Sequence, residues 1–180
     1  TMEHITWILM TYKVPPEPAA KRVALWRRLK GMGAVYLQNG VCLLPQTEEH
    51  MRQLKMLEND AAAMGGESVL LVTTSLDKAQ EDKVVGRFQA DRDDQYREFI
   101  GKCDAFEAEI AREIAKEKFT YAELEEEDNE LKKLQNWADK IRSLDFYGAP
   151  LAADASERLT SCENQLADYA RRVFDANQGL

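Results

Sequence analysis

Five basic residues lie close together near the start of the chain, and their chemistry suits contact with phosphate groups. They are Lys21, Arg22, Arg27, Arg28 and Lys30, in the run AAKRVALWRRLKG. Lys and Arg side chains neutralise backbone phosphates, which supplies affinity and position but little sequence information. A solvated helix face is the other interpretation of such a cluster, and spacing alone leaves both open.

Metal and redox chemistry find less support. An acidic cluster offers oxygen ligands for a hard cation, but it has no EF-hand spacing, and its residues suit the first turns of a helix, where the dipole favours anions. The three cysteines have no CxxC spacing and lie among apolar residues, as small buried side chains do. The acidic cluster consists of Glu123, Glu125, Glu126, Glu127, Asp128 and Glu130. The cysteines are Cys42, Cys103 and Cys162.

No motif predicts an active site. His4 and His50, the two histidines, have no nearby nucleophile or ligand-spaced companion, and the chain contains no phosphate loop, dinucleotide fingerprint, GxSxG or HExxH. We therefore expect no catalytic residue, no bound metal and no cofactor, and a protein that is not an enzyme.

The net charge of −8 is distributed unevenly over the 180 residues. The first 45 residues carry six cations against Glu3 and Glu17, whereas the whole acidic excess lies after residue 77. Binding to an anionic partner depends on the local patch rather than on the total charge. The acidic total therefore counts only weakly against nucleic acid.

The basic residues lie on a predicted helix over residues 18–32, which Gly31 and Gly33 end. At 100° per residue, the apolar side chains of this helix fall within an arc of about 160°. Arg22 projects near the middle of that arc, where it needs a carboxylate, an anion or an escape to solvent. The apolar arc consists of Val23, Leu25, Trp26 and Leu29, and Trp7, Trp26 and Trp137 are all expected as core anchors.

The elements around this helix predict an α+β module. A strand over 4–14 precedes it, a hairpin around Asn39-Gly40 follows, and a second helix, capped by Thr47, leads to a strand over 67–76. The order is that of a ferredoxin-like βαββαβ fold. A winged-helix-like module is the alternative, because a basic helix followed by a hairpin also describes that class of DNA binder.

Residues 78–180 show only helical periodicity. Apolar side chains recur at spacings of three and four, and Thr120 and Glu123 have the spacing of a capping box. We predict two domains, the αβ module at 1–77 and an all-helical extension at 78–180 packed on it as a helical hairpin or three-helix bundle. The main stripes are Phe99, Cys103, Phe106, Ile110 and Ile114, then Leu124, Leu131, Leu134, Ala138 and Ile141, then Leu159, Cys162, Leu166, Tyr169 and Val173.

The sequence resembles the amino-terminal domain of the ChrB family of chromate-resistance regulators. The resemblance covers WILMTYKVPPEPAAKRVALWRRLKGMGAVYLQNGVCLLP, GGES, DDQYREF, EIAREIAKEKFTYAELEEEDNELKKLQNWADKIRSLDFYGAP and LTSCENQLADYARRVF. It implies a cytoplasmic, chromate-responsive transcriptional regulator that binds promoter DNA, with the basic helix as the contacting element. The family has a second domain after this one, and this chain ends at Leu180.

An oxyanion sensor or protein-interaction module without DNA binding is the alternative. Chromate is a dianion, and sulfate mimics it, so its pocket needs cations and N–H groups. Arg22, Arg92, Arg97 and Arg142 are the candidates, because they lie on or near apolar helix faces. A homodimer is expected through the helical half, and no membrane segment, since the apolar run WILM is far too short to span a bilayer and no secretory signal opens the chain.

Overall fold

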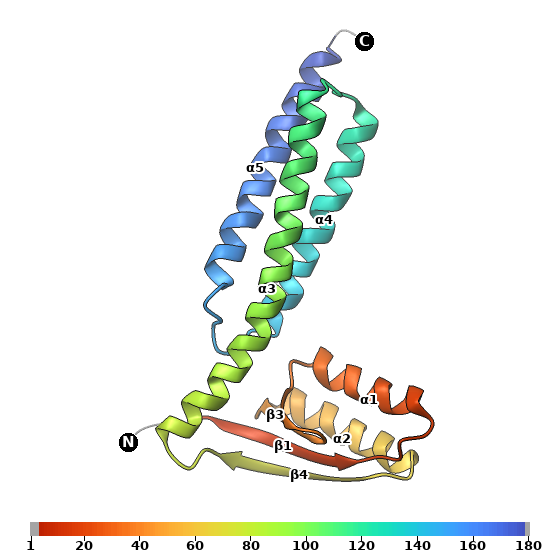
Figure 1. The fold of residues 1–180 in the computed structure, drawn as a ribbon, viewed down its shortest axis with the longest axis vertical. Helices are drawn as coiled ribbons and strands as arrows, with labels where there is room; N and C mark the ends of the chain where they lie inside the picture. Colours follow the sequence, from red (N-terminus) through yellow and green to blue (C-terminus); the bar gives the residue numbers. More distant parts are fainter. Residues whose placement is uncertain (1–3, 179–180) are drawn as a thin grey trace. The chain divides into compact units, whose positions relative to one another are not determined.

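The computed structural model describes residues 4–178, which fold as two compact units that meet within one helix. The first unit extends to Asp91 and the second begins at Arg92. The helix concerned is α3 (Lys78–Ala115), whose first turns belong to the sheet-containing unit (Figure 1). The predicted boundary at residue 77 coincides with the beginning of α3, whereas the division of contacts lies fourteen residues further on.

The first unit contains a four-stranded antiparallel sheet in the order β2-β3-β1-β4. Helices α1 and α2 lie on one face of this sheet (Figure 1). With its βαββαβ chain order, this is the ferredoxin-like arrangement, so that prediction is confirmed and the winged-helix-like alternative is wrong. The elements are β1 (Thr6–Lys13), α1 (Ala19–Gly31), β2 (Val35–Gln38), β3 (Val41–Pro45), α2 (Glu48–Ala63) and β4 (Glu67–Thr74).

The hairpin between β2 and β3 turns at Asn39-Gly40, as predicted, but by a different geometry. The prediction assumed that both turn residues have a positive φ, but of the two only Gly40 has a positive φ, at 73°. The pairing of β2 with β3 also shifts register between Tyr36 and Gln38. The N–H of Tyr12 donates a hydrogen bond to the carbonyl oxygen of Gly40 at 2.8 Å. A Cβ at residue 40 would lie only 2.4 Å from the carbonyl oxygen of Tyr12. Glycine therefore lets the hairpin tip close against β1.

Helix α1 buries a narrower face than its apolar arc suggested. Leu25 and Leu29 are 1% and 0% exposed, but Val23 and Trp26 are 41% and 48% exposed. The prediction of Trp26 as a core anchor is therefore wrong, and Arg22 is exposed rather than held in an apolar surface. Only the Leu25–Leu29 edge of the arc is buried.

Helix α2 begins at its predicted cap. The Thr47 hydroxyl accepts a hydrogen bond from the His50 N–H at 3.0 Å, which satisfies one of the free donors of the first turn. Its buried side chains are Leu54, Leu57 and Ala61, which pack at helical spacing against the sheet unit.

The second unit is a three-helix bundle of the later turns of α3 with α4 (Tyr121–Ser143) and α5 (Ala152–Ala176) (Figure 1). The predicted stripes supply its core, although Ile114 and Leu124 are only partly buried. The Thr120 hydroxyl accepts from the Glu123 N–H at 3.2 Å, which is one of the two bonds of the capping box. Trp137 packs edge-on against Phe99 with ring centroids 5.6 Å apart.

Within residues 4–178, no helix combines the length and apolar character that a membrane crossing requires.

Candidate nucleic-acid interface

The five basic residues of α1 divide into side chains with and without a carboxylate partner. Arg28 forms an ion pair with Asp60 of α2, and Lys30 Nζ lies 3.3 Å from Asp91 of α3. Lys21 borders the shallow groove between α1 and α2 that also contains Arg28 and Asp60. The ion pairs of Arg28 and Lys30 thus each join α1 to another element of the same unit.

Lys21 has no carboxylate partner among the described residues, and neither have the two arginines Arg22 and Arg27. Both are exposed, and within the described residues no carboxylate lies at ion-pair distance from either guanidinium. An exposed guanidinium keeps its five N–H donors for a bound anion, to which it can bind in bidentate fashion. The two side chains are therefore the strongest phosphate-contact candidates of α1.

Arg22 lines a groove between α1, β1 and the tip of the hairpin. The groove has a volume of about 700 Å³, and its lining combines cations, exposed aromatic surface and the hairpin turn. Its principal residues are Lys13, Arg22, Trp26, Lys30, Tyr12 and Tyr36, with Asn39 and Gly40 at the turn.

Tyr12 and Tyr36 join across the sheet inside this groove. Their hydroxyl oxygens lie 2.7 Å apart and their rings meet edge to face at 6.4 Å. Burial raises the pKa of both hydroxyls, and the charge of Arg22 offsets part of the rise in the pKa of Tyr12. The two neutral hydroxyls carry two protons, and their mutual hydrogen bond uses one of them. The other proton can be donated to a ligand, so the tyrosine pair and Arg22 together suit an anion.

The other predicted anion-binding arginines belong to the helical unit. Arg92 is 4% exposed and its Nη1 lies 3.3 Å from the carbonyl oxygen of Leu144. Arg97 pairs with Asp94 at 2.8 Å and Arg142 pairs with Asp139, in each case three residues earlier on its own helix. The contacts of Arg97 and Arg142 are thus those of ordinary surface ion pairs, and the prediction of an anion site at these residues stays untested.

Sequence reasoning missed four lining residues of the groove, namely Tyr12, Lys13, Trp26 and Tyr36. Only one signal pointed to any of them: Arg22 and Trp26 are four residues apart and so share a helix face. Tyr12 and Tyr36 come together through the pairing of β1 with β3 and of β3 with β2, which places both near Cys42.

The fold and the groove define a ferredoxin-like α+β protein with a cationic, aromatic-lined concavity and a helical bundle. A family profile described as "Protein ChrB, N-terminal" matches residues 22–180. The chain belongs to this family. It is also similar to Protein ChrB of Cupriavidus metallidurans, with 30% identity over 114 residues that make up 59% of this chain and 35% of that protein. The matched segment thus spans about a third of the length of this curated relative.

Proposed function

We propose that this chain is a chromate-responsive transcriptional regulator that binds promoter DNA through α1. The observation that carries the proposal is the pair of exposed, uncompensated guanidinium groups at Arg22 and Arg27, on a unit whose first 45 residues have a positive net charge. Lys21 adds a third cation, while Arg28 and Lys30 have carboxylate partners. Family membership supports the same proposal.

The proposal includes a cytoplasmic homodimer without catalytic activity, in which the helical unit joins the two copies. Tyr121 and Phe174 support it, because they are 52% and 54% exposed and their rings lie 5.7 Å apart on α4 and α5. Exposed aromatic side chains are typical of surfaces that bind another protein.

Anisotropy titration of labelled DNA from upstream of the chain's own operon tests DNA binding. We expect the double variant Arg22→Glu/Arg27→Glu to bind at least ten times more weakly than the parent. If each arginine contacts one phosphate, the salt dependence of log K should also decrease in slope by about 2 units. Circular dichroism confirms that the variant is folded.

The matched control is Arg52→Glu/Lys55→Glu, which changes the net charge equally at two exposed positions of α2, in the same unit. The control should keep at least half of the parent's affinity. Equal loss in both double variants, or none in the α1 variant, would contradict the assignment of α1 as the contacting element.

Oxyanion binding in the groove is a second candidate, favoured by the neutral Tyr12–Tyr36 pair beside Arg22. Sulfate serves as the probe because, unlike chromate, it does not oxidise thiols. At ten times its Kd, sulfate should stabilise the chain by about 1.4 kcal/mol and so raise Tm by several degrees. Tyr36→Phe should reduce that rise and Arg27→Glu should not, whereas equal rises in parent and Tyr36→Phe would exclude the hydroxyl pair from the site.

A further inference from the structure

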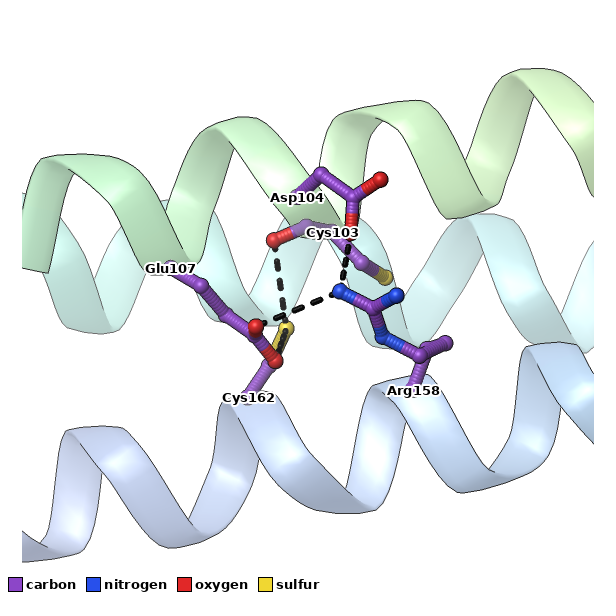
Figure 2. Close-up of polar contacts among 5 residues, drawn as sticks. All are labelled: Cys103, Asp104, Glu107, Arg158 and Cys162. Atoms are coloured by element: carbon purple, nitrogen blue, oxygen red, sulfur yellow. Dashed lines mark hydrogen bonds and ion pairs between the residues drawn. The ribbon is translucent and has the colours of Figure 1, made fainter.

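Two cysteine side chains meet in the core of the helical bundle. Cys103 on α3 and Cys162 on α5 are 59 positions apart, both 0% exposed, and both carry free thiols. The Cys162 sulfur lies 3.6 Å from the carbonyl oxygen of Cys103 and 3.8 Å from Glu107 Oε1. Figure 2 shows both side chains in the space between the facing turns of the two helices. The two cysteines are therefore direct neighbours across the contact between α3 and α5.

Charged groups next to the pair make the two thiols chemically different. Arg158, one turn before Cys162, forms ion pairs with Asp104 and Glu107 of α3 (Figure 2). A hydrogen bond from the Cys162 thiol and the positive charge of Arg158 lower the pKa of Cys103, while burial acts in the opposite direction. The same hydrogen bond, together with burial and the nearby carboxylate of Glu107, raises the pKa of Cys162. Cys103 is therefore the thiol that ionises first.

We propose that Cys103 and Cys162 are a redox couple, which a hydroperoxide oxidises to a disulfide that joins α3 to α5. The arrangement has the two parts that such a couple needs, a nucleophilic thiol and a second thiol beside it that resolves the first product. Cys42 is the internal contrast: burial in β3 raises its pKa to about 12, and no other thiol contributes to that shift. This inference does not depend on DNA binding.

The chemistry balances with hydrogen peroxide as the oxidant. The Cys103 thiolate attacks one peroxide oxygen, the O–O bond breaks, and hydroxide leaves and takes up a proton as water, which leaves a sulfenic acid on Cys103. The Cys162 sulfur then attacks the Cys103 sulfur, the S–O bond breaks, and the departing hydroxide takes the Cys162 proton as a second water. The two sulfurs lose two electrons in all, and the peroxide gains them.

Access to the pair comes from a local opening that precedes the chemistry as a rapid equilibrium, so the reactivity of the thiols still sets the rate. Because both residues are 0% exposed, the oxidant reaches them when the helices open locally. The Arg158 side chain above the pair is 36% exposed, and its partner Asp104 is 56% exposed. Exposed ion pairs of this kind contribute little to stability, so this part of the α3–α5 contact opens more readily than the apolar core around it.

Thiol counting on the full chain tests the proposal. After treatment with hydrogen peroxide and denaturation, we expect the number of titratable thiols to fall from three to one, and reductant to restore all three. Tryptic mapping without reductant should give one linked peptide pair, which contains Cys103 and Cys162. If all three thiols persist, or if Cys42 occurs in the linked pair, the proposal is wrong.

Variants separate the roles of the residues. In Cys42→Ser, peroxide treatment should reduce the number of titratable thiols from two to none. In Cys162→Ser, Cys103 should stop at the sulfenic acid, which dimedone traps. Arg158→Gln should slow the oxidation several-fold, whereas Arg171→Gln, which removes another paired arginine of α5, should leave the rate unchanged. Equal rates in both arginine variants would overturn the role of Arg158, and mapping of the unmodified chain decides the couple itself even where a cysteine variant fails to fold.

Discussion

Glu127 provides the sharpest test of the electrostatics of the helical unit. It is 5% exposed on α4, and burial, followed by the charges of Glu109, Glu113, Glu123 and Glu126, raises the pKa of its carboxyl to about 7. Because 7 lies above the ordinary value of 4.5, the folded chain holds this proton more tightly than the unfolded chain. The resulting stability is fully present below pH 4.5 and is lost as pH rises through about 7.

The magnitude follows from the size of the shift and from the position of the side chain. At about 1.4 kcal/mol per pKa unit, the full shift corresponds to an upper limit of about 3 kcal/mol. Glu127 borders a groove between α3 and α4 that is open to water, so its carboxylate keeps part of its hydration. With that screening, we expect the ionised carboxylate to cost about 1–2 kcal/mol at pH 8.

Glu127→Gln removes this titration while it preserves the shape of the side chain. Urea unfolding followed by circular dichroism should show the variant about 1–2 kcal/mol more stable than the parent at pH 8 and within about 0.5 kcal/mol of it at pH 4. Glu126→Gln, at an exposed neighbouring position, is the matched control and should change little at either pH. A gain of equal size at pH 4 and pH 8, or the same gain in the control, would refute the reasoning.

Two further substitutions test the αβ unit. Leu29→Ala should destabilise it by about 2–5 kcal/mol in urea unfolding because Leu29 is 0% exposed, whereas Val23→Ala, at a 41% exposed position of the same helix, should change stability by less than about 0.5 kcal/mol. Gly40→Ala should destabilise the unit by more than about 1 kcal/mol, because the alanine Cβ would lie 2.4 Å from Tyr12 O and because residue 40 has a φ of 73°. Asn39→Ala is the control for this change. Equal effects of the two substitutions would exclude the close approach as the cause.

Much of the fold could be predicted because its signals are local. The hydroxyl of Thr47, the Asn39-Gly40 turn and apolar spacings of three and four each act within a few residues, and each occurs at its predicted position. The errors arise where a partner surface decides. Ideal helix geometry placed Trp26 on an apolar arc, but it could not show which edge of that arc the sheet covers.

The candidate site was harder to predict for the same reason. Arg22 belongs to the basic run, but its proximity to the Tyr12–Tyr36 pair depends on the pairing of β3 with both β1 and β2, which brings together two tyrosines 24 positions apart. The partners of Arg28 and Lys30, Asp60 and Asp91, are likewise 32 and 61 positions away. A count of charges along the chain could not separate paired cations from exposed ones.

This separation has a consequence for how a nucleic acid would approach α1. Arg22 and Arg27 are five positions apart, which at 100° per residue places them about 140° apart around the helix, so they cannot both lie at the centre of one flat contact. Arg22 shares its groove with Lys13 and Lys30, which concentrates positive charge on that side.

We therefore expect Arg22→Glu alone to weaken DNA binding more than Arg27→Glu alone. If Arg22 is the main contact, a DNA phosphate and a small oxyanion compete for the Arg22 guanidinium, and sulfate should displace the DNA. A larger loss in Arg27→Glu would place the DNA on the other side of α1, where both ligands could bind together.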